Sequence, residues 1–74
     1  MYSLVGVDGN AFALMGYTAK AMRKAGFTEE EIKGMYAEAE SGDYYNLIAV
    51  CDDYVNKVNE KLGLTEDEEE DYDD

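Results

Sequence analysis

The chain has 74 residues and a formal net charge of −12, with 18 acidic residues, six basic residues and no histidine. A single domain of this size is near the lower limit at which a hydrophobic core alone sustains a fold. The charge argues against direct binding to nucleic acid, which needs clustered lysine and arginine. The absence of a run of about 18 apolar residues argues against a membrane span.

Acidic residues are concentrated at the C-terminal end of the chain. Residues 65–74 hold eight of the 18 acids and no base, so the remaining ten acids and six bases give residues 1–64 a charge of −4. A run of like charges without apolar periodicity is typical of a disordered segment. The sequence therefore predicts a folded domain over residues 1–64 and an acidic disordered tail over residues 65–74.

The first helix is predicted from about Gly9 to Ala25, after an apolar arm over residues 1–7 that we expect to cover a helical face. Asp8 is the expected N-cap of this helix. Gly16 in the helix interior predicts close approach by another helix, because glycine otherwise weakens a helix. The expected buried stripe follows helical spacing and comprises Phe12, Met15, Ala19 and Met22.

Two further helices follow across short links. Thr28 and Glu31 have the spacing of a capping box, which starts the second helix. Asp43 then caps a long third helix that ends at Gly63. The third helix carries the widest apolar stripe, formed by Tyr44, Leu47, Ile48, Cys51, Tyr54, Val55, Val58 and Leu62. The short links predict an all-α fold, a compact three-helix bundle whose first two helices cover this stripe.

The residues needed for most catalytic and metal-binding chemistry are missing or isolated. The chain has no histidine and one cysteine, Cys51, so it has neither a Ser-His-Asp set nor four soft ligands for zinc. We expect no enzyme activity, no catalytic residue, no cofactor and no metal site. Cys51 lies on the apolar stripe, where a buried reduced thiol is typical. A lone thiol suits a reducing compartment, so we expect a cytoplasmic protein without a membrane segment or signal peptide.

Four residues are candidates for contact with a partner. Tyr17 and Tyr45 are not explained by the buried faces of their helices, and both Asp52 and Asp53 lie opposite the apolar stripe. An exposed tyrosine beside carboxylates is a fair anchor for a protein interface. The alternative is a tyrosine lying flat on the rim of a small core, next to solvated carboxylates. The predicted partner-binding residues are therefore Tyr17, Tyr45, Asp52 and Asp53.

Two motifs at predicted helix starts resemble those of a known protein group. Asp8-Gly9-Asn10-Ala11-Phe12 opens the first helix, and Ser41-Gly42-Asp43-Tyr44 followed by Leu47 opens the third. Together they resemble a group of small uncharacterised bacterial proteins met in phage and mobile-element sequences, over roughly residues 4–58. This resemblance implies a bacterial cytoplasm and a phage or prophage origin. It implies no activity and no functional residue.

These observations favour a small non-catalytic protein-interaction module, an adaptor or inhibitor that binds through tyrosines and acids. A basic surface on the partner is the expected attraction for an acidic chain. The alternative is an acidic mimic of nucleic acid that blocks a DNA- or RNA-binding protein. A further alternative is a homo-oligomer with contacts through Leu47, Val50 and Tyr54. The long helix would offer more apolar surface than two short helices cover.

Overall fold

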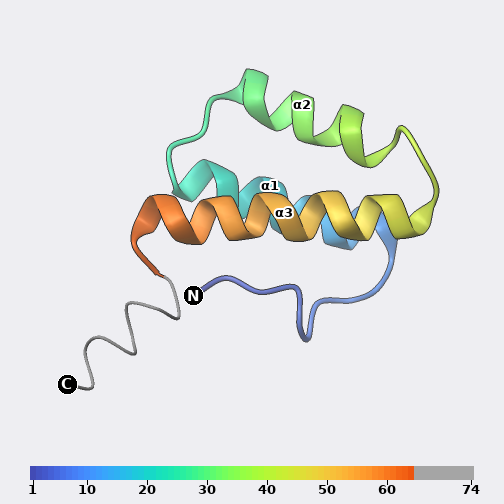
Figure 1. Ribbon diagram of the computed structural model, residues 1–74, viewed down its shortest axis with the longest axis horizontal. Coiled ribbons are helices and arrows are strands. Elements are labelled where there is room, and N and C mark those ends of the chain that lie inside the picture. Colours follow the sequence, from blue (N-terminus) through green and yellow to red (C-terminus); the bar gives the residue numbers. More distant parts are fainter. Residues whose placement is uncertain (65–74) are drawn as a thin grey trace.

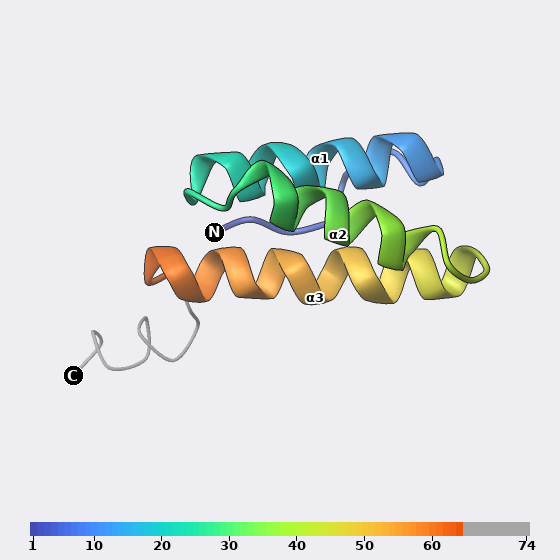
Figure 2. The ribbon, with the colours of Figure 1, turned by 90° about the horizontal axis from the view of Figure 1, so that it is seen from above.

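The computed structural model describes residues 1–64, which form three α-helices: α1 (Ala11–Lys24), α2 (Glu29–Ala39) and α3 (Tyr44–Leu62). The helices α1 and α3 run in the same direction, and α2 returns in the opposite direction (Figure 1). Seen from above, α2 lies across one face of the α1–α3 pair (Figure 2). The predicted all-α three-helix bundle is confirmed. The predicted disordered tail, residues 65–74, lies outside the described residues.

The N-terminal arm covers the face of the α1–α3 pair opposite α2 (Figure 1). Its side chains at Tyr2, Leu4 and Val7 are half-buried and pack against the core. A turn interrupts its extended course, because the Val7 N–H donates to the Leu4 carbonyl at 3.1 Å and Gly6 takes a φ of 87°. This turn leaves Val5 91% exposed. The arm therefore covers a helical face, as predicted, but its course is not continuously extended.

The core is built from one face of each helix. Thr18, the one buried residue with a hydroxyl among residues 1–64, donates its Oγ1 hydrogen to the Leu14 carbonyl at 2.8 Å, so its polar group is satisfied. Burial of apolar surface is the main stabilising contribution in such a small domain. The buried apolar side chains are Leu14, Met15, Ala19, Ala21, Met22, Ala25, Ile32, Met35, Ala39, Leu47, Cys51, Val55 and Val58.

The start of α1 differs from the prediction. The N-cap is Asn10, whose side chain accepts a hydrogen bond from the Ala13 N–H at 3.1 Å. The Asp8 carboxylate instead accepts from the Asn10 N–H at 2.9 Å, which forms a turn just before the helix. Phe12 is 80% exposed, so its predicted place in the core is wrong. The buried face of α1 is rotated toward Leu14 and away from Phe12.

The prediction that another helix approaches closely at Gly16 is also wrong, and the glycine with the closest neighbour is Gly42. No neighbouring atom lies within 4 Å of the position that a Cβ at Gly16 would occupy. At Gly42, by contrast, a Cβ would lie 2.9 Å from the Cβ of Asn46. The Asn46 amide Nδ2 donates to the Glu38 carbonyl at 2.9 Å, near the C-terminal end of α2. Gly42 therefore makes room for a side chain that joins the end of α2 to the start of α3.

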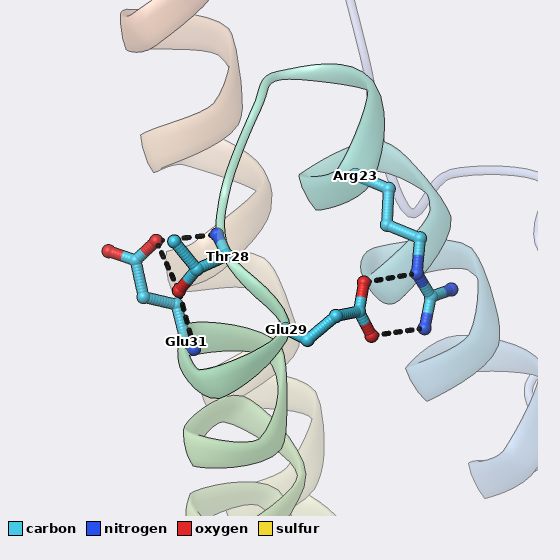
Figure 3. A network of polar contacts seen from close by, with 4 residues as sticks. All are labelled: Arg23, Thr28, Glu29 and Glu31. Atoms are coloured by element: carbon cyan, nitrogen blue, oxygen red, sulfur yellow. Dashed lines mark hydrogen bonds and ion pairs between the residues drawn. The ribbon is translucent and has the colours of Figure 1, made fainter.

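The predicted helix caps of α2 and α3 are confirmed. Figure 3 shows the capping box, in which Thr28 Oγ1 accepts from the Glu31 N–H at 3.1 Å and Glu31 Oε1 accepts from the Thr28 N–H at 2.8 Å. Arg23 at the end of α1 forms a two-pronged ion pair with Glu29, with Nε 3.0 Å from Oε2. Asp43 caps the start of α3, and Gly63, which has a φ of 74°, caps its end. Local sequence signals therefore fix the start of α2 and both ends of α3.

The first turn of α2 makes the stability of the domain depend on pH. The Arg23 guanidinium lowers the pKa of Glu29 below its ordinary 4.5, and the Thr28 N–H does the same for Glu31. Because an unfolded carboxyl group titrates at its ordinary pKa, these two groups contribute stability above about pH 4.5. That contribution is lost as the pH falls through their lower pKa values in the folded chain.

We therefore expect the doubly substituted variant Glu29→Gln with Glu31→Gln to lose less stability on acidification than the wild-type chain. The measurement is urea unfolding of both proteins between about pH 3 and pH 7, compared as differences in free energy. Glu30→Gln is the control, because it removes a charge from the same turn but neither of these contacts. An identical acid dependence in the double variant and the wild type would contradict the assignment.

Candidate partner-binding surface

The side of α3 that points away from the bundle presents Tyr45 and Asp52 together. Four exposed residues at helical spacing form this surface, which we call the outer face of α3: Tyr45, Ala49, Asp52 and Asn56. Tyr45 is 79% exposed. Asp52 is seven positions after Tyr45, which is about 10 Å along the helix axis. Tyr45 and Asp52 therefore share one exposed face of α3.

The ring of Tyr45 stands next to a second aromatic ring at the start of α3. Tyr44 meets it edge to face, with 6.4 Å between ring centroids and 71° between ring planes. The Tyr44 hydroxyl donates to the carbonyl of Gly9, in the link between the arm and α1. Aromatic pairs of this geometry favour a defined ring orientation. Tyr45 is thus an exposed ring beside a neighbour that is itself anchored.

The two predicted carboxylates have different surroundings, although both are exposed. Asp53 Oδ2 lies 3.3 Å from the ammonium of Lys57. The hydrogen bond with Asp53 raises the pKa of Lys57. The same ammonium lies 4.6 Å from the centroid of the Tyr54 ring, so Asp53 belongs to a local cluster beside α2. Asp52 forms no ion pair within residues 1–64 and shares the outer face of α3 with Tyr45.

Tyr17 has a contact inside the domain that the sequence did not reveal. Its Oη accepts a hydrogen bond from the Ser3 N–H at 3.0 Å. Its ring meets Tyr2 edge to face, with centroids 6.2 Å apart. Tyr17 is half-buried under the arm, so the structure separates it from Tyr45 and gives it a role in holding the arm.

Asn59 is the contact residue that sequence analysis missed. Its side chain is on the buried side of α3 and the residue is 6% exposed. Its Oδ1 accepts from the Tyr2 N–H at 2.8 Å, and its Nδ2 donates to the Tyr2 carbonyl at 2.8 Å. One signal could have revealed it, since an amide four residues after buried Val55 needs a polar partner inside the fold. Nothing in the sequence names Tyr2 as that partner.

The three residues predicted to form a homo-oligomer contact, Leu47, Val50 and Tyr54, pack largely within the domain. Leu47 is buried, and Val50 and Tyr54 are half-buried against the core. The Tyr54 hydroxyl donates to Glu38 Oε2 on α2 at 3.2 Å. Burial and the nearby Glu38 carboxylate raise the pKa of Tyr54. Helix α2 therefore occupies the side of α3 that these residues form.

The surroundings of Cys51 lower the reactivity of its thiol. Cys51 is a free cysteine that is completely buried. Burial raises the pKa of its thiol, and a hydrogen bond with Thr18 acts in the opposite direction. The thiolate, which is the reactive form, is therefore disfavoured. Within residues 1–64, no cluster of three or more histidine, cysteine or acidic side chains has the arrangement of a metal site.

The protein is a small three-helix domain with an N-terminal arm across one face of the α1–α3 pair and an exposed tyrosine, Tyr45, on α3. None of the described helices combines the length and apolar character needed to cross a membrane. No family model, curated protein or solved structure matches this chain. The function of this chain is therefore inferred from the residues on its own surface.

Proposed function

We propose that this chain is a small non-catalytic protein-interaction module that binds a protein partner through the outer face of α3. The observation that carries the proposal is Tyr45, which is 79% exposed on the first turn of a rigid helix. Tyrosine is enriched among the residues that dominate binding energy in protein interfaces. Its ring supplies apolar contact area, and its hydroxyl supplies a hydrogen bond.

The charge around Tyr45 supports a partner with a basic surface. Asp52 lies on the same face, and residues 1–64 carry a net charge of −4. A partner with a basic surface would gain both a faster encounter and a carboxylate contact. We place this adaptor or inhibitor in the bacterial cytoplasm, in keeping with the resemblance of its helix-start motifs to small phage and mobile-element proteins.

The test is affinity capture of the full-length chain from a bacterial host lysate at low and high salt. A retained protein is then purified, and its Kd is measured for the wild type and two variants. We expect Tyr45→Ala to weaken binding about 30-fold, the loss produced by removing an interface anchor worth about 2 kcal/mol. Phe12→Ala is the matched control, since it removes an aromatic ring of similar exposure from α1.

The outcomes separate this proposal from the nucleic-acid mimic. Loss of binding in Tyr45→Ala with a normal Phe12→Ala supports the outer face of α3. An unchanged Kd for Tyr45→Ala contradicts it. Retention of nucleic-acid-binding proteins that disappears at high salt would instead favour mimicry of phosphate charge, because such binding depends mainly on screened electrostatics.

A further inference from the structure

All six basic side chains of the chain lie in one half of the domain. Helix α2 runs opposite to α1 and α3, so its first half lies beside the second halves of the other two (Figure 1, Figure 2). The ammonium of Lys61 lies 4.6 Å from the centroid of the Phe27 ring, which joins the last turn of α3 to the link between α1 and α2. We call the second halves of α1 and α3, together with the first half of α2, the basic half. Its basic residues are Lys20, Arg23, Lys24, Lys33, Lys57 and Lys61.

The acids of residues 1–64 are distributed in the opposite sense. The basic half holds four of them against six bases, which leaves it a net charge of +2. The other half holds six acids and no base, which gives it a charge of −6 when Asp53, at the midpoint of α3, is counted with it. The acids of the basic half are Glu29, Glu30, Glu31 and Glu60, and those of the other half are Asp8, Glu38, Glu40, Asp43, Asp52 and Asp53. An anionic segment is therefore attracted to the basic half and repelled by the other.

Half of the bases remain open to a new carboxylate. Arg23 and Lys57 are each held in an ion pair, and the ammonium of Lys61 lies over an aromatic ring. The remaining three side chains are exposed and form no ion pair within residues 1–64: Lys20, Lys24 and Lys33. Lys20 and Lys24 are one helical turn apart on α1, so their ammonium groups are neighbours. These three lysines can bind carboxylates without breaking a contact of the domain.

The chain itself carries an anionic segment beside the basic half. Leu64, just after α3, is the last residue that the structure describes. Eight of the nine residues from 66 to 74 are acidic, and the ninth is Tyr72. An extended chain advances about 3.3 Å per residue, whereas packed helices are about 8–10 Å apart. Residues 66–74 are therefore long enough to reach α1 and α2 from the end of α3, at an effective concentration of roughly millimolar.

We propose that the basic half is a binding surface for an acidic segment, and that residues 66–74 of the same chain occupy it through carboxylates paired with Lys20, Lys24 and Lys33. The supporting observation is the separation of charge, which places every base at the end of the domain from which these residues continue. Exposed ion pairs are individually weak, so the contact is reversible and is screened by salt.

This contact controls how much acidic charge the chain offers to a partner. Carboxylates that pair with the basic half are withheld from a basic partner until that partner or salt displaces them. Tyr45 and Asp52 lie in the other half of the domain. The outer face of α3 is therefore separate from this surface, and either proposal can fail alone.

A spin label within residues 66–74 tests the contact in the full-length chain. Tyr72→Cys provides the attachment point without removing a carboxylate, and buried Cys51 is protected from the reagent. NMR then measures how strongly the label broadens each backbone amide signal at low and high salt. The matched control is the same labelled chain with the eight acids of residues 66–74 replaced by their amides, which keeps the tether and removes the charge.

At low salt we expect the broadening at Lys20, Lys24 and Lys33 to be about threefold or more stronger in the acidic chain than in the amide chain, because three weak ion pairs act together. The difference should disappear at high salt. Replacing all three lysines with glutamine should also remove it. Lys57→Gln is the control, since its ammonium is already paired with Asp53, and it should leave most of the difference in place. Circular dichroism checks that each variant remains helical.

Equal broadening in the acidic and amide chains at low salt would overturn the proposal. So would a difference that persists after the three lysines are replaced, because the segment would then lie elsewhere. A mixture of isotope-labelled copies without the spin label and spin-labelled copies without the isotope identifies the molecule that supplies the segment. Broadening in that mixture would assign the surface to the segment of a second copy and contradict the contact within one chain.

Discussion

Replacing Met22 with alanine is expected to lower the free energy of unfolding by about 2–5 kcal/mol. Met22 has no exposed surface and belongs to the buried cluster that joins the three helices. Truncation removes apolar contacts and leaves a cavity that a small core fills only partly. A domain of this size has a total stability of about 3–10 kcal/mol, so urea unfolding should show a large loss.

Phe12→Ala is the control for Met22→Ala, because the sequence assigned both residues to one stripe and the structure separates them. Phe12 is 80% exposed, so its truncation should change the stability by no more than about 0.5 kcal/mol. Met22→Leu, which nearly conserves volume, should cost less than about 1.5 kcal/mol and keeps the comparison informative if the alanine variant fails to fold. Equal losses for Met22→Ala and Phe12→Ala would contradict the observed orientation of α1.

Replacing Gly16 and Gly34 together with alanine is expected to stabilise the domain by about 1–2 kcal/mol. Both glycines lie inside helices, and no neighbouring atom is within 4 Å of where either Cβ would stand. Alanine lowers the conformational entropy of the unfolded chain without a clash in the folded one. Thermal unfolding should show a rise in Tm of roughly 5–15 °C.

Gly26→Ala is the matched control for the two helical glycines. Gly26 also has open space around it, but its φ is 88°. An L-residue in this region is strained by about 1–2 kcal/mol, so Gly26→Ala should lower the Tm. A rise in Tm for Gly26→Ala, or no gain for the double variant, would show that the backbone at these positions is not as described.

The sequence predicted those features whose physical cause is local. The capping box joins Thr28 to Glu31 within three residues, and Gly63 ends α3 through its own backbone conformation. The start of α1 was missed because Asp8 and Asn10 are both good N-caps and lie two residues apart. The structure uses Asn10, and Phe12 is 80% exposed because the buried face of α1 is centred on residues such as Leu14 and Thr18.

Of the candidate partner-binding residues, those placed by helical spacing could be predicted and those placed by tertiary contacts could not. Tyr45 and Asp52 could be assigned to an exposed face because helical spacing alone places them opposite the buried stripe. The role of Tyr17 could not be found in this way. Its partner is the main chain of Ser3, and the arm has no periodic pattern that specifies where it lies. The contacts of Tyr17 and Asn59 with the arm are tertiary features, because no local sequence signal names Ser3 or Tyr2 as their partners.

The pairing of Tyr2 with Asn59 joins residues 57 positions apart, and so it sets the order in which the fold can be completed. A ribosome synthesises the arm before it synthesises Asn59. The arm, α1 and α2 are therefore synthesised before Asn59. The face of the core that α3 covers stays exposed until α3 has formed. The last turns of α3 complete the domain by pairing with the arm, so removing either the arm or these last turns should leave the same bond unformed.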